Sequence, residues 1–246
     1  MRVSLRERDC GACPYLEGRT WRTEEFFVAS LDPAIYEELL AVGFRRSGHL
    51  FYRPACPSCA RCVPLRLSAE SFRPSKSQAR LLRKNAEVGV RLVPAGYDEE
   101  RYLLYRRYVA ARHGEREAEP DREAYRGFLV DGPLATSAVA EYRLPDGRLV
   151  AAGYLDILPG GLSSVYFAFD PEESRRSLGT WSVLRELELA VSLGKPYYYL
   201  GFWVPGSPKM DYKAGFAPFE YARGGVWSPA NDREEALAAV GAAGST

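Results

Sequence analysis

The chain lacks any segment that could act as a membrane span or a secretion signal. No window of its 246 residues approaches the roughly 18 to 20 consecutive apolar residues that a transmembrane helix needs. Its first eight residues, Met1–Arg8, contain no apolar stretch of the kind found in signal peptides. Internal repeats and low-complexity segments are also missing. We therefore expect a globular cytoplasmic protein with no membrane partner.

Cysteine is scarce, and its five residues cannot all pair in disulfides. They fall into two groups, Cys10 with Cys13 and Cys56 with Cys59 and Cys62, each spaced in threes. Two Cys-x2-Cys pairs can hold Zn²⁺ or an iron–sulfur cluster in a four-thiolate site, with either Cys56–Cys59 or Cys59–Cys62 as the second pair. The alternative is that all five are free thiols whose spacing is accidental.

The overall charge of +1 hides a strongly basic block. Between Arg45 and Arg91 there are nine arginines and two lysines against Glu70 and Glu87. Phosphate groups attract such clusters regardless of nucleotide sequence, so the block indicates a polyanionic partner. A solvated basic surface is the simpler alternative.

Residues 1–95 read as an irregular N-terminal domain that carries the cysteines and the basic block. The pattern predicts a helix over Pro33–Ala41 with Asp32 as its N-cap. Short strands are expected over His49–Arg53 and Val63–Leu67. A basic helix is expected over Ser75–Asn85.

Residues 96–230 are more regular and predict a second domain. After a helix over Asp98–Ala111, two tight turns separate three strands, which should form an antiparallel meander. A helix and a further strand follow, and residues 231–246 read as a flexible tail. The expected elements are strands Thr136–Tyr142, Leu149–Ile157 and Ser163–Phe169, helix Trp181–Leu193 and strand Tyr197–Trp203.

This order is similar to that of acyl-CoA N-acyltransferases, which gives an α+β class with a GNAT-like mixed sheet and flanking helices. In that fold the turn before the helix offers backbone N–H groups to a negatively charged group. The corresponding turn here contains Arg176, Gly179 and Thr180, which we take as substrate-binding residues. An ordinary capped helix is the alternative.

Many segments of the sequence match one family of enzymes. The chain resembles the arginyl-tRNA–protein and aspartate/glutamate leucyl-tRNA–protein transferases of the N-degron pathway, and is most similar to the bacterial leucyl branch. The matching segments are Cys13–Leu16, Gly43–Gly48, Tyr52–Pro54, Cys56–Arg66, Phe72–Gln78, Arg83–Asn85, Tyr105–Tyr108, Arg112–His113, Phe169–Pro171, Arg176–Thr180, Tyr199–Trp203, Pro205–Gly206, Lys209–Met210 and Tyr212–Lys213.

The resemblance implies leucyl-tRNA as the donor and proteins with N-terminal Asp or Glu as acceptors, upstream of regulated proteolysis. It also implies a cysteine-bearing N-terminal domain, because the related arginyl enzymes bind a metal or iron–sulfur cluster there. The chemistry itself requires no cofactor, since the aminoacyl ester is already activated. An arginyl transferase, or a metal-binding tRNA-binding module without activity, are the alternatives.

The reaction requires groups that read an acidic residue, bind tRNA phosphates and move a proton. For the acidic side chain we single out Arg73, Lys76, Lys209 and Lys213, each of which could instead be in a surface ion pair. The phosphates are assigned to Arg80, Arg83 and Lys84. The candidate catalytic residues are His113 as a base, Asp170 as a base or a turn cap, and Tyr212 as a donor to the leaving ribose.

Overall fold

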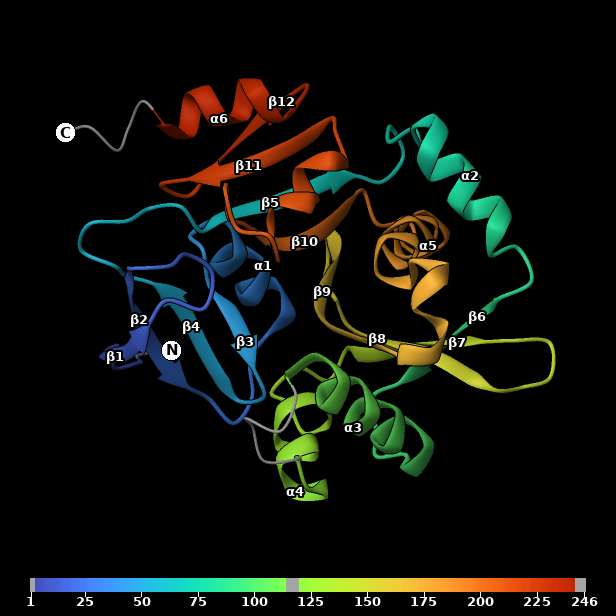
Figure 1. Ribbon diagram of the computed structural model, residues 1–246. Coiled ribbons are helices and arrows are strands. Elements are labelled where there is room, and N and C mark those ends of the chain that lie inside the picture. The colour runs from blue at the N-terminus through green and yellow to red at the C-terminus, as the bar shows by residue number, and fades with distance from the viewer. Residues whose placement is uncertain (1–2, 114–119, 242–246) are drawn as a thin grey trace.

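The computed structural model describes residues 3–113 and 120–241, which form two sheets (Figure 1). The smaller sheet has the strand order β1-β2-β4-β3, and the larger has the order β12-β11-β5-β10-β9-β8-β7-β6. The strands are β1 Arg6–Ala12, β2 Thr20–Phe27, β3 Arg45–Ser47, β4 Leu50–Pro54, β5 Val63–Ser68, β6 Gly89–Pro94, β7 Ser137–Arg143, β8 Leu149–Ile157, β9 Gly161–Phe169, β10 Tyr197–Trp203, β11 Phe219–Arg223 and β12 Val226–Ala230.

Helices cover both faces of the larger sheet. Helix α3 packs on β8 and β9, whereas α5 packs on β9 and β10 and also contacts α2. The helices are α1 Pro33–Ala41, α2 Lys76–Lys84, α3 Glu99–His113, α4 Arg122–Tyr125, the π-helical turn η2 Arg126–Val130, the 3₁₀ turn η3 Pro171–Arg176, α5 Leu178–Ser192, the 3₁₀ turn η4 Asp211–Gly215 and α6 Arg233–Gly241.

The elements with clear local signals form as predicted. The Asp32 side chain accepts a hydrogen bond from Ala34 N at the start of α1. Ser75 and Gln78 form a reciprocal capping box that starts α2. The meander β7-β8-β9, helix α5 and strand β10 are all present, so the α+β class with a GNAT-like mixed sheet is confirmed.

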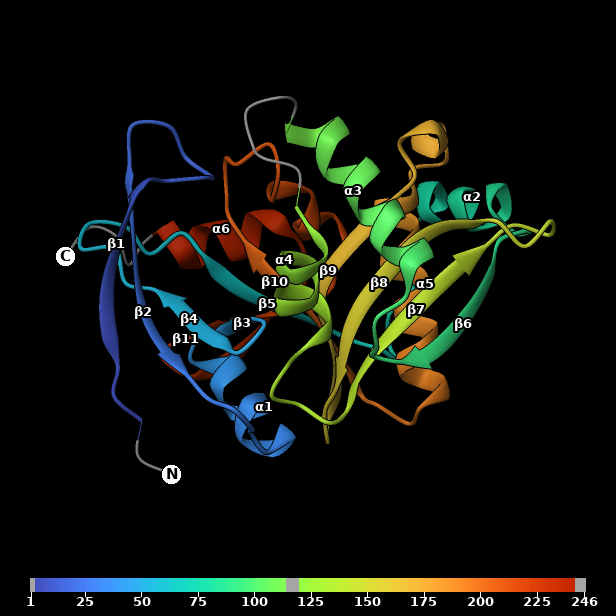
Figure 2. The ribbon, with the colours of Figure 1, turned by 90° about the horizontal axis from the view of Figure 1, so that it is seen from below.

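Two observations bear on the predicted domain organisation. Strands β5 and β6 belong to the larger sheet, so this sheet contains strands from both sides of the predicted boundary at residue 95, and the boundary itself stays a prediction (Figure 2). The predicted flexible tail contains α6, which buries Ala236 and Val240 against the main core. Residues 242–246 of that tail lie outside the described chain.

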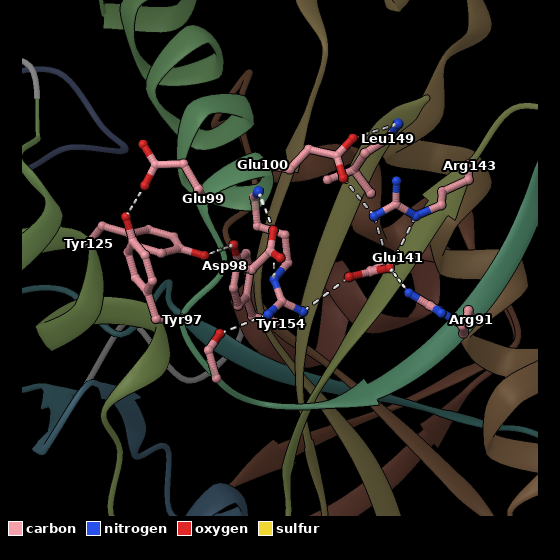
Figure 3. A network of polar contacts seen from close by, with 12 residues as sticks. Arg91, Tyr97, Asp98, Glu99, Glu100, Tyr125, Glu141, Arg143, Leu149 and Tyr154 are labelled. Atoms are coloured by element: carbon pink, nitrogen blue, oxygen red, sulfur yellow. Dashed lines mark hydrogen bonds and ion pairs between the residues drawn. The ribbon is translucent and has the colours of Figure 1, made fainter. Parts of the chain in front are cut away.

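A polar network fastens α3 to the edge of the larger sheet (Figure 3). The buried Glu141 carboxylate on β7 accepts from Arg91 at 2.9 Å and from Arg101 at 3.2 Å. Burial alone would raise the pKa of Glu141, but hydrogen bonds from Arg91 and Arg143 and nearby positive charge hold it below its usual value. Close by, the hydroxyls of Tyr125 and Tyr154 lie 2.8 Å apart. These contacts fix α3, whose last turns face the site described next.

Candidate active site

A cleft of about 1040 Å³ opens where β9 and β10 part. The two strands run parallel but pair only between Tyr197–Tyr199 and Gly161–Ser163. Beyond that point both Ser164 on β9 and Leu200 on β10 line the cleft. A register shift opposite Tyr154 and Leu155 marks a bulge in β9 at the same place. The strands therefore form a wedge, and the smaller sheet supplies its opposite wall through β1, β2, β3 and β4.

The N-terminus of α5 lies at the mouth of this wedge. Ser177 adopts a left-handed conformation with φ 55° and turns the chain into the helix. Residues 177–180 line the cleft, among them the predicted Gly179 and Thr180. The first amides of a helix have no intrahelical partner and favour negative charge. Arg176, in contrast, pairs with Glu173 at 2.6 Å and Glu87 at 2.8 Å and is not among the lining residues, so its contact with substrate stays a prediction.

Two buried cations meet at the base of the cleft. Lys213 is 9% exposed, and its Nζ donates to the Leu200 carbonyl at 2.9 Å. Arg45 on β3 is 6% exposed, and its guanidinium lies 4.8 Å from the ring centroid of Phe202. A methyl group placed on Gly201 would lie 3.2 Å from Lys213 Nζ and 4.0 Å from Arg45 Nε. The two cations therefore flank one spot.

Neither cation has a carboxylate partner within the described part of the chain. Arg45 Nη1 donates to the Phe44 carbonyl at 2.6 Å, but Arg45 Nε and Nη2 are buried with no hydrogen-bond partner. Burial and the nearby Arg45 charge lower the pKa of Lys213 to about 7. Buried donors without partners are costly, so this spot is suited to an incoming anion.

Arg45 was not singled out from the sequence, although it belongs to the matching segment Gly43–Gly48. Only its burial beside Lys213, which is far away in the chain, marks it as a site residue. Its neighbour Arg46 has a structural role, because it forms a buried ion pair with Asp156 at 2.6 Å.

The predicted Lys209 and Tyr212 both line the cleft. Lys209 is exposed, in the turn before η4, and does not share a helical face with the buried Lys213. Loss of hydration raises the pKa of the Tyr212 hydroxyl to about 12, so this group stays protonated and can donate at neutral pH.

Two predicted catalytic residues are not placed in the cleft. Asp170 caps η3 by accepting from Glu172 N at 3.1 Å, and its carboxylate also faces Arg107 at 3.4 Å. The structure therefore shows the capping alternative, and the role of Asp170 as a proton acceptor stays a prediction. His113 ends α3, but its side chain lies outside the described part of the structure.

The cations of α2 and the loop before it form an exposed group away from the cleft lining. Lys76, Arg80 and Arg83 are exposed on α2, and Lys84 Nζ donates to the Arg175 carbonyl. Arg73 donates to the carbonyls of Glu70 and Phe72. Neither Arg73 nor Lys76 lines the cleft that holds Arg45 and Lys213. Their role in reading an acidic side chain stays a prediction, as does contact of the α2 residues with tRNA.

The cysteines are divided between two places. Cys10 lines the cleft, with its Sγ 3.6 Å from Thr23 Oγ1, whereas Cys56, Cys59 and Cys62 line a second hollow and Cys13 lies near Cys62. Burial, together with the neighbouring thiols of Cys59, Cys13 and Cys56, raises the pKa of Cys62 to about 12. Among residues 3–113 and 120–241, no three His, Cys, Asp or Glu side chains gather in a way that would hold a metal ion. The arrangement does not fit a preformed metal site, and the predicted zinc or iron–sulfur cluster stays a prediction.

No helix in the described part of the chain is both long and apolar enough to span a membrane. The parted strands, the cleft between them and the helix N-terminus at its mouth are the arrangement of a GNAT-like acyltransferase fold. Residues 11–80 match the family described as arginine-tRNA-protein transferase, N terminus, and residues 100–223 match its C terminus. The chain belongs to this family.

Two proteins similar in sequence to this chain are both named aspartate/glutamate leucyltransferase. An aspartate/glutamate leucyltransferase of Marinobacter nauticus is 44% identical over 87% of this chain and 91% of its own. One from Chromobacterium violaceum is 41% identical over 87% of this chain and 89% of its own. The solved structure of FemX aligns with 84% of this chain and 81% of its own at 9% identity, with a TM-score of 0.48.

Proposed function

We propose that this protein transfers Leu from leucyl-tRNA to the N-terminal Asp or Glu of acceptor proteins. The observation that carries this proposal is the pair of buried cations, Arg45 and Lys213, with no carboxylate partner in the described chain. An acidic first residue supplies the missing carboxylate and satisfies the free guanidinium donors. Its α-amine would then lie within the same cleft. The names of the relatives support the same reaction.

The composition of the cleft favours Leu over Arg as the transferred residue. An arginyl side chain calls for carboxylates in its pocket, whereas a leucyl side chain calls for apolar walls. Among the described residues that line the cleft, the only carboxylate is Glu25, on the wall formed by the smaller sheet. The wall around the wedge offers Phe167, Phe169, Leu178 and Val183 instead. A leucyl pocket on that wall agrees with this distribution.

The reaction needs positioning more than new functional groups. The neutral α-amine attacks the ester carbonyl, the new amide bond forms, and the ribose oxygen leaves. Holding both reactants in one cleft supplies much of the rate, and Tyr212 can hydrogen-bond to the leaving oxygen. The amides at the start of α5 suit the terminal phosphate of the tRNA, and the exposed cations of α2 suit phosphates further along it. No cofactor takes part in this scheme.

The product is a protein that begins with Leu, and we propose that it enters N-degron-dependent degradation. Because the donor is a charged tRNA, we also assign the reaction to the cytoplasm.

A donor-and-acceptor matrix tests the proposal. Purified protein is incubated with labelled leucyl-tRNA or arginyl-tRNA and with peptides that begin with Asp, Glu or Ala. We expect Leu on the Asp and Glu peptides only. Transfer of Arg instead would identify an arginyl transferase. Retention of tRNA without transfer to any peptide would leave a tRNA-binding module.

A further inference from the structure

Behind the cleft, two tyrosines converge on one buried carboxylate. Glu186 on α5 is 1% exposed; its Oε1 accepts from the Tyr142 hydroxyl at 2.9 Å and its Oε2 from the Tyr198 hydroxyl at 2.5 Å. A methyl group on Gly153 would lie 2.5 Å from Glu186 Oε1, so β8 allows the carboxylate into this space only because it carries a glycine there. The position of the Glu186 carboxylate is therefore fixed by the two tyrosine hydroxyls and by the close approach of β8 at Gly153.

Only one of the two tyrosines reaches the cleft. Tyr198 lies on β10, lines the cleft and also hydrogen-bonds to the side chain of Ser164, another lining residue on the parted β9. Both side chains are almost fully buried, Tyr142 at 0% and Tyr198 at 1% exposure, but Tyr142, on β7, is not among the lining residues. A chain of hydroxyls therefore runs from the cleft to Glu186 through Tyr198, and Tyr142 lies on its far side.

The groups that face Glu186 determine its protonation. Two of them donate hydrogen bonds to it, the Tyr142 hydroxyl from β7 and the Tyr198 hydroxyl from β10. Tyr212 of η4 is near enough for the Glu186 charge to raise the pKa of its hydroxyl, and Arg185 on α5 lies near Tyr142. No cation forms an ion pair with Glu186 in the described structure. Burial raises the pKa of Glu186 to about 7, and the two tyrosine hydrogen bonds offset part of that rise. The carboxyl is thus near half-ionised at neutral pH, which suits a proton acceptor.

We propose that Tyr198 and Glu186 form the proton relay of the transfer reaction. This inference rests on the proposed function. As the amine nitrogen bonds to the ester carbon, its proton passes to Tyr198 Oη while the Tyr198 proton passes to Glu186 Oε2. When the ester C–O bond breaks, the proton returns along the same path to the ribose oxygen, so the enzyme ends unchanged. Tyr198 is the group that touches the reacting atoms, and Glu186 acts through it.

If Glu186 served only to link Tyr142 on β7 to Tyr198 on β10, this position would not need an ionisable side chain. A buried carboxylate costs free energy that an amide or an apolar side chain would avoid. Two hydroxyls that both donate to it are the arrangement expected for an anionic, proton-accepting form.

Single-turnover rates of the full-length protein with labelled leucyl-tRNA and an Asp-starting peptide, measured between pH 5.5 and 9, test the relay. The variants are Glu186→Gln, Tyr198→Phe and Tyr142→Phe. We expect Glu186→Gln and Tyr198→Phe to lower the rate by about 10²-fold and to remove the rise near pH 7. The ionisation of the amine itself, near pH 8, remains in every variant.

Tyr142→Phe is the matched control, because it removes a hydroxyl of the same kind from the same carboxylate. It should keep the rate at high pH within about threefold and shift the rise to higher pH, since the carboxylate loses one stabilising donor. Equal losses in Tyr142→Phe and Tyr198→Phe would show a structural tie and overturn the relay. So would a Glu186→Gln variant that keeps the rise near pH 7.

If Glu186→Gln does not fold, the comparison between the two tyrosine variants decides alone. A wild-type protein that transfers Leu while its tyrosine variants behave alike disproves the relay but not the proposed function. A wild-type protein that transfers to no acidic peptide overturns both.

Discussion

Two groups of cations in this molecule differ in almost every respect except charge. Lys76, Arg80 and Arg83 lie close together in the sequence, on the solvent face of α2. Arg45 on β3 and Lys213 on η4 are distant in the sequence and are buried side by side in the cleft. The first group is easily recognised in the sequence, and the second only in three dimensions.

From this difference we infer separate roles for the two groups of cations. Exposed cations are well hydrated, and a single exposed ion pair is worth only about 0–1 kcal/mol. A buried cation without a partner has lost its hydration, and an anion of the right shape that binds beside it compensates for that loss. We therefore assign affinity for the polyanionic donor to α2 and the choice of acceptor to Arg45 and Lys213. The following predictions sharpen that division.

The largest effect is expected from removing a buried cation. Arg45→Met and Lys213→Met should each lower kcat/KM for an Asp-starting peptide by about 10²-fold, because one partner of a buried charge pair is lost. The ratio of Asp-peptide to Ala-peptide transfer should fall with it, and this ratio does not depend on the fraction of folded enzyme. Unchanged leucyl-tRNA binding is the control. A variant that keeps full preference for Asp would contradict the assignment.

A smaller, pH-dependent effect follows from the lowered pKa of Lys213, at about 7. Because the lysine loses its charge as pH rises through 7, binding of a carboxylate should weaken at higher pH. A succinyl peptide tests this cleanly, since it presents the Asp carboxylate without an amine. Its Kd should rise about tenfold between pH 7 and pH 8.5. Lys213→Arg should abolish this dependence, because arginine stays charged; the same rise in that variant would argue against Lys213 as the group responsible.

The smallest effect is expected on the exposed surface. The double variant Arg80→Gln with Arg83→Gln should weaken tRNA binding by about fivefold and flatten its salt dependence by about one unit per lost phosphate contact. Preference for acidic peptides should not change. Arg122→Gln with Arg126→Gln, two exposed cations at α4, is the matched control. Equal weakening by both pairs would show that α2 has no special place in tRNA binding.

Most elements with strong local signals could be predicted, and those held by distant pairing could not. The Asp32 cap predicted α1, the helix-forming residues of Ser75–Asn85 predicted α2, and tight turns predicted the β7-β8-β9 meander. Strands β1 and β2 were missed because their polar residues, such as the buried Thr23, do not alternate with apolar ones in a clear pattern. Helix α6 was missed because its alanines resemble a frayed terminus until they meet the core.

The same limit applied to the site. Lys213 and Tyr212 lie in matching family segments, and Gly179 and Thr180 were chosen from the turn before the helix in the GNAT-like order; all four line the cleft. Arg45 and Glu186 were not singled out, because a charged residue in a sequence carries no sign of its burial or of its neighbours. Arg45 becomes informative only through its unpaired donors, and Glu186 only through the two hydroxyls that face it.

One contact at the narrow end of the wedge links the two walls. Glu37 of α1 accepts from the Tyr199 hydroxyl at 2.7 Å and from the Gly160 amide at 2.8 Å, at the point where β9 and β10 begin to part. These two hydrogen bonds hold α1 against the larger sheet, next to the segment where β9 and β10 pair. Both strands that form the wedge are therefore tied, through one carboxylate, to the N-terminal region that carries the opposite wall.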